Sequence, residues 1–313
     1  MKITTCPVCG SRENRVLFSD RNRRDGLDCE GTYVRCRKCG LVYLGVRPDW
    51  QTICGYYGST NADVTANTGR LDIEAYRRQL EKKLPVWTKR PHLLRRDPHS
   101  WPFEKPAAGR NRMLDIGCGC GYRLFEFSVR GYETWGIDVS ADAIDVCRKI
   151  LPKGRFFCGE PETLSLPENY FDYIRLDNVL EHVPDPVKTL GRCFSLLRNQ
   201  GRIFVYVPHA HGLGLKIFRQ DSVVSWIPFH LQLFTRESLK DALSTAGFSR
   251  NRVCGHNQSG WLALSLAQRR SRGRRKAALN AGHCAKYLCR ALGFAAGKFG
   301  LSEELAAAGI KNA

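Results

Sequence analysis

The chain has 313 residues, of which 43% are hydrophobic, so it can bury a sizeable core in one or two domains. It carries 49 lysines and arginines against 30 acidic residues, a formal net charge of +19. No apolar run is long enough to span a bilayer, and the N-terminal sequence lacks the apolar stretch of a signal peptide. These features count against a membrane-spanning or secreted protein, and we expect a cytoplasmic one.

The excess positive charge lies in the flanks of the chain. Residues 1–50 carry a net +4, residues 51–110 +5, residues 111–268 only +2, and residues 269–313 +8. Composition divides the chain at the same boundaries. We expect a small cysteine-rich module (1–50), a helical linker region (51–110), a nearly neutral main domain (111–268) and a basic tail rich in alanine and glycine (269–313).

Two C-x-x-C pairs, CPVCG and CRKCG, stand in the first segment with 26 residues between them. Four thiolates at this spacing predict a tetrahedral zinc site in a zinc ribbon. A redox-active pair usually occurs singly near a βαβ unit, and the remaining cysteines are too scattered to suggest disulfides. Such a closed zinc site supplies stability rather than catalysis. The predicted zinc ligands are Cys6, Cys9, Cys36 and Cys39.

The linker region begins with a helical pattern and ends with a broken one. RLDIEAYRRQLEKKL, residues 70–84, predicts a helix, whereas prolines interrupt PHLLRRDPHSWPFEKP, residues 91–106.

Short β-rich runs alternate with helical runs in the main domain. RMLDIG precedes YRLFEFSVRG, ETWGIDVS precedes ADAIDVCRKIL, FDYIRLD precedes PVKTLGRCFSLLRN, and GRIFVYVP precedes RESLKDALSTAG. NRVCGH and WLALSLAQ, which ends at residue 268, are expected as the last β-rich runs. This alternation predicts a doubly wound α/β sheet.

A glycine-rich loop, LDIGCGCG, follows the first strand of this sheet. Ligands of open α/β sheets bind beyond the carboxyl ends of the strands, where glycines let the backbone approach them closely. The spacing D-x-G-x-G-x-G does not fit the dinucleotide fingerprint, because tyrosine and leucine stand where its third glycine would fall. By itself the loop is equally compatible with a tight turn that binds no ligand. Its acidic residue and glycines are Asp115, Gly117, Gly119 and Gly121.

Acidic residues also follow the next three strands of the predicted sheet. Asp138 ends the second strand, where a carboxylate can accept hydrogen bonds from both ribose hydroxyls. Glu160 follows the third strand, and Asp177 and Asn178 follow the fourth. All could therefore border one ligand.

At these residues the chain resembles the class I S-adenosylmethionine-dependent methyltransferases over about residues 110–268. The resemblance implies a Rossmann-like, doubly wound sheet of seven strands that binds S-adenosylmethionine. It implies that Asp115 and the glycine loop (Gly117, Gly119, Gly121) face the methionine part of the cofactor. It further implies ribose binding by Asp138, adenine binding near Glu160, and closure of the site beneath the methionine end by Asp177.

The order of zinc ribbon, linker and methyltransferase domain resembles bacterial methyltransferases of sugar modification and surface-glycan biosynthesis. Those proteins carry a segment similar to IPFHLQLFTRESLKDALSTAGF after the fifth strand. This resemblance implies a small-molecule acceptor such as a sugar or glycan precursor. NVLEHVPDP also resembles the ubiquinone-pathway O-methyltransferases, but those have a glutamate at the position of Asn178. Its absence and the added zinc ribbon count against that assignment.

Two histidines are candidates for the general base that removes the acceptor's proton. His230 lies in the insertion 209–230 after the fifth strand, and such insertions commonly cover the acceptor site in this fold class. His182 lies just beyond the fourth strand, near the expected methyl group. Both could instead be structural, and His209 and His211 are weaker candidates.

The basic tail begins with RRSRGRRK, residues 269–276, and could contact an anionic membrane surface or nucleic acid. A solvated, partly disordered tail is the alternative. Three functions follow: a small-molecule methyltransferase, an RNA or ribosome methyltransferase that docks through the ribbon and basic flanks, and a non-catalytic zinc-binding scaffold. The near-neutral main domain disfavours the second, and the intact loop with Asp138 disfavours the third. Apolar residues that could line one helical face of the tail are Leu279, Tyr287, Leu288, Leu292 and Phe299.

Overall fold

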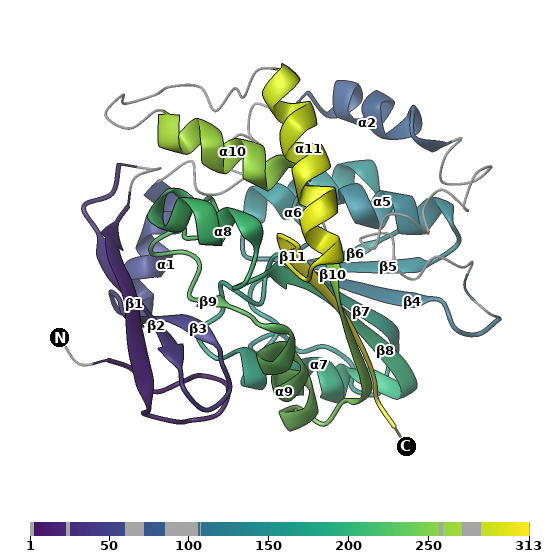
Figure 1. Cartoon of the computed structure of the whole chain (residues 1–313). Coiled ribbons are helices and arrows are strands. Elements are labelled where there is room, and N and C mark those ends of the chain that lie inside the picture. Colours follow the sequence, from purple (N-terminus) through teal and green to yellow (C-terminus); the bar gives the residue numbers. More distant parts are fainter. Residues whose placement is uncertain are drawn as a thin grey trace.

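The structure is a computed structural model that describes residues 3–22, 26–59, 72–84, 106, 108–256, 259–270 and 283–312. Two sheets organise this part of the chain (Figure 1). The smaller sheet is antiparallel, in the order β1-β2-β3-β9. Its first three strands are β1 (Asn14–Arg21), β2 (Glu30–Cys36) and β3 (Val42–Val46), whereas β9 (Gln232–Leu233) comes from the main domain.

The larger sheet has seven strands in the order β10-β11-β8-β7-β4-β5-β6. Strands β4 to β8 are parallel, and the order reverses between β4 and β7. Strands β10 and β11 are antiparallel to their neighbours. This confirms the predicted doubly wound sheet. The strands are β4 (Arg112–Ile116), β5 (Glu133–Asp138), β6 (Arg155–Cys158), β7 (Phe171–Asp177), β8 (Leu197–Pro208), β10 (Ser249–His256) and β11 (Glu304–Ile310).

Helices cover both faces of the large sheet (Figure 1). On one face lie α2 (Ile73–Glu81), α5 (Tyr122–Val129) and α6 (Ala141–Ile150), and on the other α7 (Pro186–Leu196) and α9 (Arg236–Thr245). Side-chain caps begin several of them: Ser140 accepts from the N–H of Ala143, and Asp185 from that of Lys188. Helix α2 lies in the stretch predicted to be helical, whereas the proline-interrupted segment lies outside the described residues apart from Pro106.

The C-terminal part of the chain differs from the sequence-based expectation. Residues 261–268 belong to a helix, α10 (Ser259–Arg270), not to a strand, and a second helix, α11 (His283–Lys298), follows. The seventh strand is β11, inserted between β8 and β10. The segment 269–313 is therefore not a tail, because its end lies inside the sheet. RRSRGRRK continues past the end of α10, and its residues 271–276, like Leu279, lie outside the described part.

Four of the seven residues of strand β11, ELAAAGI, are alanine or glycine, which have low strand propensity by themselves. Its position between two strands satisfies its backbone on both edges, and four of its side chains, Glu304 to Ala307, are fully buried. Lys311 then anchors the chain end, because its Nζ donates to Asn169 Oδ1 and to the carbonyls of Phe194 and Leu197. Tertiary pairing, rather than composition, makes this segment a strand.

Candidate functional site

The glycine loop turns sharply between β4 and α5. Gly117, Gly119 and Gly121 all have left-handed φ values, +71°, +51° and +79°. A Cβ on Gly117 would lie 2.2 Å from Cγ2 of Val179, and one on Gly121 would lie 2.9 Å from Sγ of Cys147. A Cβ on Gly119 would meet nothing within 4 Å. Packing therefore explains the first and third glycines, whereas the second faces open space that a ligand could fill.

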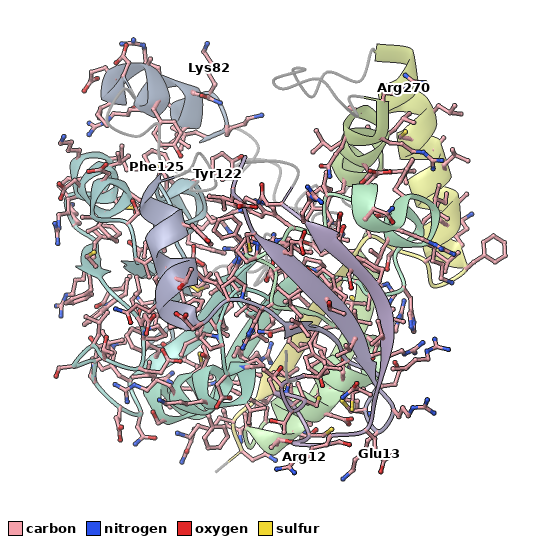
Figure 2. All side chains as sticks on the ribbon, turned by 90° about the vertical axis from the view of Figure 1, so that its left-hand side faces the viewer. Arg12, Glu13, Lys82, Tyr122, Phe125 and Arg270 are labelled. Atoms are coloured by element: carbon pink, nitrogen blue, oxygen red, sulfur yellow. The ribbon has the colours of Figure 1, made fainter. Side chains whose placement is uncertain are left out.

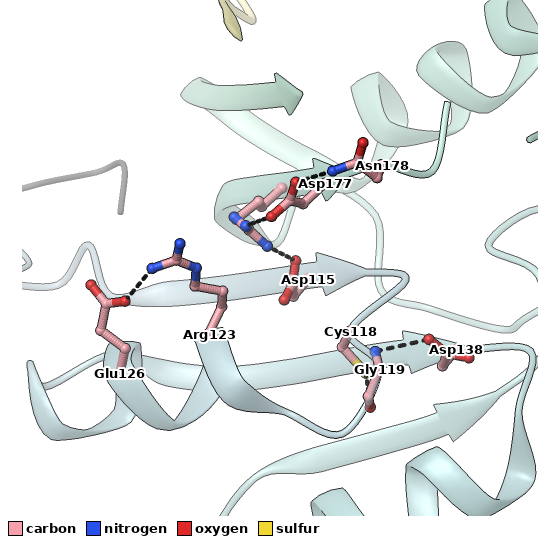
Figure 3. A network of polar contacts seen from close by, with 9 residues as sticks. Asp115, Cys118, Gly119, Arg123, Glu126, Asp138, Asp177 and Asn178 are labelled. Carbon is pink, nitrogen blue, oxygen red and sulfur yellow. Dashed lines mark hydrogen bonds and ion pairs between the residues drawn. The ribbon is translucent and has the colours of Figure 1, made fainter. Parts of the chain in front are cut away.

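Asp138 holds the middle of this loop against the end of β5 (Figure 3). Its Oδ2 accepts from the backbone N–H of Gly119 at 2.9 Å, and its Oδ1 from that of Ser140 at 2.9 Å. A carboxylate has about four lone-pair sites, so the group can accept more hydrogen bonds than these two. The predicted ribose residue thus lies directly beside the open face of Gly119.

A buried arginine joins two of the predicted cofactor residues. Nη1 of Arg175, on β7, donates to Oδ1 of Asp115 at 2.9 Å, and Nη2 contacts Asp177. Burial lowers the pKa of Arg175, but the charges of Asp177 and Asp115 outweigh it, so the net pKa is raised and the guanidinium stays charged. The structure therefore places Asp115 in a buried ion pair at the base of the loop.

Sequence reasoning did not single out Arg175, although an arginine within the apolar strand FDYIRLD was a signal. Asp177 has a second partner, because its Oδ1 accepts from Nδ2 of Asn178 at 2.9 Å (Figure 3). Asp115, Arg175 and Asp177 thus tie the ends of β4 and β7 together.

Glu160 is exposed after β6 and lies near a helix of the linker region, α1 (Trp50–Ser59). Burial and the Glu160 carboxylate together raise the pKa of the Cys54 thiol on that helix. Ile53 of α1 is fully buried and packs on Phe229 and Leu231. The linker region thus contributes a helix that reaches both the end of β6 and the insertion 209–230.

The two candidate bases belong to one cluster. The rings of His182 and His230 lie 4.8 Å apart between centroids, and Nε2 of His182 is 3.9 Å from Oε1 of Glu181. This cluster adjoins the glycine loop, because Val179 at the start of the same segment packs against Gly117. One ligand atom from each of Glu181, His182 and His230 lies within 4.8 Å of the others, so the three could also hold a metal ion.

Backbone carbonyls hold the Nδ1 proton of both histidines. Nδ1 of His182 lies 3.0 Å from the carbonyl of Phe229, and Nδ1 of His230 lies 2.8 Å from that of Val224. Because a carbonyl can only accept, each Nδ1 carries a proton, and in the neutral ring Nε2 then carries the lone pair. Burial lowers the pKa of His182 to about 4, which keeps it neutral near pH 7.

Glu181 is completely buried beside these rings. Neither of its carboxylate oxygens has a hydrogen-bond partner among the described residues. Burial raises the pKa of this carboxyl well above its ordinary value. An unsatisfied buried carboxyl is costly, and such groups are retained mostly where function uses them.

The two weaker candidate bases, His209 and His211, contact other parts of the structure. His209 is buried, and its Nδ1 donates to the carbonyl of Ser302, which joins the end of β8 to the segment before β11. Nε2 of His211 lies 3.1 Å from Nη2 of Arg35, in the small sheet.

The four cysteines of the two C-x-x-C pairs come together as predicted. Sγ of Cys6 lies 3.5 Å from that of Cys39, and Sγ of Cys9 lies 3.5 Å from that of Cys36. All four sulfur atoms lie within 4.8 Å of one another. Tetrahedral zinc with Zn–S bonds of about 2.3 Å requires sulfur separations of roughly 3.8 Å, so the residues present fit that ion.

The ribbon also holds the insertion that carries His230. Strand β3 pairs with β9, and the carbonyl of Leu231 accepts from the N–H of Leu44. The buried hydroxyl of Tyr33 donates to the carbonyl of His230 at 2.8 Å. Nδ2 of Asn22 donates to the carbonyl of Ile227 at 2.7 Å. Nothing in the local sequence indicates these contacts, which join segments about 200 residues apart.

The chain is similar to known methyltransferases. A family model described as a methyltransferase domain matches residues 77–250. The ubiquinone biosynthesis O-methyltransferase of Bradyrhizobium sp. (strain ORS 278) is 30% identical over 185 residues, which cover 56% of this chain and 72% of that protein. A protein of the same name from Rhodopseudomonas palustris (strain BisB5) is 32% identical over 123 residues, 37% of this chain and 48% of that one.

Among solved structures, a chain from the complex between the Haloferax volcanii Trm112 methyltransferase activator and a methyltransferase shares the fold. The TM-score is 0.50 at 13% identity, with 77% of this chain and 98% of that chain covered. Among the described residues, no helix is both long and apolar enough to cross a membrane.

Proposed function

The chain belongs to the methyltransferase-domain family and is an S-adenosylmethionine-dependent methyltransferase, and we propose that it methylates a small-molecule acceptor with the help of the Glu181–His182–His230 cluster. The observation that carries this proposal is the juxtaposition of two sites. A glycine loop with an open face at Gly119 lies next to a segment that carries His182, whose ring contacts that of His230.

The loop residues fit the cofactor because the second glycine leaves space where a side chain would otherwise stand. Asp138 would hold the ribose, Glu160 would lie near the adenine, and the loop backbone would border the methionine part. Gly117 and Gly121 shape the turn, and Arg175 fixes Asp115 and Asp177 beneath it. When bound, S-adenosylmethionine supplies an electrophilic methyl group, so the protein's own task is to align the acceptor and remove its proton.

His230 or His182 would take that proton at Nε2. Both are already in the tautomer that leaves Nε2 able to accept, and the depressed pKa of His182 keeps it unprotonated at neutral pH. A proton gained by His182 would lie 3.9 Å from Oε1 of Glu181, and the positive charge would in turn favour ionisation of that carboxyl.

A sugar or glycan precursor is our first candidate for the acceptor, because a zinc ribbon precedes the domain and an insertion of this kind follows β8. A phenolic acceptor is the second candidate, since two relatives of the chain are named ubiquinone biosynthesis O-methyltransferases. Against it, Asn178 replaces the glutamate expected there. We also propose one zinc ion on Cys6, Cys9, Cys36 and Cys39, and a cytoplasmic location with peripheral association at a membrane.

Mass spectrometry of a cell extract supplied with methyl-labelled cofactor should identify a small labelled product that forms only with active protein. The Asp138→Ala variant should bind S-adenosylmethionine about 2 kcal/mol more weakly in a calorimetric titration, because it loses the ribose acceptor. The Ser140→Ala variant serves as a control, since it disturbs the same turn but leaves the carboxylate. Equal affinity of Asp138→Ala and the parent would refute the assignment.

His230→Ala should lower turnover by roughly 100-fold or more and leave cofactor affinity nearly unchanged, as expected of a base. His230→Gln should not restore it. His182→Ala, nearer the glycine loop, should disturb turnover and cofactor affinity together. Near-normal turnover of His230→Ala would move the role of base to His182.

A further inference from the structure

The helices α10 and α11 form a pair inserted between the two antiparallel strands β10 and β11 (Figure 1). Residues 257–302 contain nine lysines and arginines and no aspartate or glutamate. The exposed cations of the described part include Arg269 and Arg270 at the end of α10 and Lys298 at the end of α11. This insertion accounts for much of the positive charge of the whole chain.

Among its described side chains, helix α11 buries some apolar residues and leaves others exposed. Cys289 and Ala296 are buried. Leu288 and Leu292 are 62% and 48% exposed, and their spacing of four residues places them on one side of the helix. Phe299, which is 82% exposed, follows directly after the end of the helix at Lys298. Large apolar side chains in a row at such exposure indicate a binding surface rather than an ordinary surface helix.

We propose that this helical pair docks the protein onto an anionic lipid bilayer, with α11 lying in the plane of the interface. An exposed apolar stripe flanked by cations is the composition of an interfacial helix. At 16 residues, α11 is too short to cross the membrane, and a length of about 24 Å suits it to lie along the surface.

Charge selects the bilayer over other occupants. A second copy of the chain would bring nine like charges against nine, which repel. Nucleic acid would satisfy the cations but would leave Leu288, Leu292 and Phe299 in water. Anionic headgroups beside acyl chains satisfy both features at once.

The docking surface packs against the insertion 209–230, which carries the proposed base His230. Leu262 of α10 and Cys289 of α11 share an apolar cluster with Phe218, which ends α8 (Leu213–Phe218). Helix α8 belongs to the insertion 209–230, which ends at His230. If the proposed function holds, the acceptor is therefore carried by a lipid and reaches the site from the membrane surface.

Co-sedimentation with phosphatidylcholine vesicles, with and without phosphatidylglycerol, tests the docking. The full-length protein should bind the anionic vesicles, bind the neutral ones far less, and dissociate as salt is raised. Leu288→Asp and Phe299→Asp should each weaken binding roughly tenfold, because burial of such a side chain is lost.

Val16→Asp, at an exposed valine on β1, is the matched control and should bind like the parent. Figure 2 shows the start of β1, marked by Arg12 and Glu13, at the opposite end of the molecule from Arg270. Should the aspartate variants fail to fold, Arg269→Gln with Arg270→Gln tests the same surface and should weaken binding by roughly 30-fold.

Absence of binding to anionic vesicles, or equal loss in the control and the test variants, would overturn the inference. So would binding to an RNA oligonucleotide in preference to vesicles, which would identify a nucleic-acid surface instead. Cofactor affinity is measured on the same samples. Intact cofactor binding without vesicle binding rejects only the docking, whereas the reverse result rejects the proposed function and leaves the docking standing.

Discussion

Replacing Gly119 by alanine should separate cofactor binding from folding, because the structure leaves open space on that side of the loop. The added methyl group would contact no protein atom within 4 Å, and the N–H that donates to Asp138 would remain. The fold would suffer only from the left-handed φ of +51°, which costs an alanine about 1 to 2 kcal/mol. The lower entropy of the unfolded chain offsets part of that cost. We expect a net loss of roughly 1 kcal/mol, or a few degrees in Tm.

The same methyl group would occupy the space assigned to the cofactor. We expect the dissociation constant for S-adenosylmethionine to rise at least tenfold, which corresponds to about 1.4 kcal/mol. Gly117→Ala gives the opposite pattern, since its Cβ would lie 2.2 Å from Cγ2 of Val179. Overpacking adds about 1 to 3 kcal/mol to the backbone cost there, so this variant should lose several times more stability than Gly119→Ala.

Thermal unfolding without ligand and calorimetric titration with S-adenosylmethionine measure the two effects independently. Gly119→Ala with parental affinity would show that the open face is not the cofactor site. Gly117→Ala with parental stability would show that the loop is not packed as the structure describes.

Three further predictions concern the zinc site, the C-terminal strand and pH. Elemental analysis should find one zinc per chain. The Cys9→Ser variant should lose the zinc and most of its turnover but keep its cofactor affinity. Protein purified without chelators but lacking zinc would contradict this prediction. Deletion of residues 303–313 removes β11 from the middle of the sheet and should abolish cooperative unfolding, so a truncated chain with a parental melting curve would rule out this position. Burial lowers the pKa of His182 and of His209 to about 4, so the unfolded chain binds protons that the folded chain excludes as pH falls below about 6.5. Stability should fall by about 2 kcal/mol per histidine between pH 7 and pH 5 in urea titrations, and an unchanged midpoint would argue against the buried neutral state.

The sheet could be predicted from sequence because its pattern is local. Four of the five parallel strands are followed by a helix, and the central strands are largely buried, so short apolar runs and helical runs mark the order of elements. The two C-x-x-C pairs and the glycine loop could also be predicted from sequence, because metal binding and a tight turn each require particular residues at a fixed spacing.

The structural features that the sequence did not indicate depend on contacts between distant segments. Strand β11 is alanine-rich and becomes a strand only because β8 and β10 flank it. The residues after β10 were read as a strand and a tail, although they form an inserted helical pair. The role of Arg175 depends on the pairing of β4 with β7. That pairing places Asp115 and Asp177 beside one guanidinium, and neither contact is evident from the sequence.

The four-cysteine module and the proposed base form one structural unit, so the proposed zinc ion would affect turnover without an open coordination position. A segment of about twenty residues cannot hold a histidine in place by itself, because ordering its backbone costs more than its local contacts return. Strand β3 supplies an edge for β9, and Tyr33 fixes the carbonyl of His230 itself. Zinc binding that folds β2 and β3 would therefore order His230 from outside the main domain. The proposed cofactor residues do not need that support, because Asp138 ends β5 and Gly119 lies in the loop after β4, both parts of the main domain. Metal loss should therefore reduce turnover without reducing cofactor affinity.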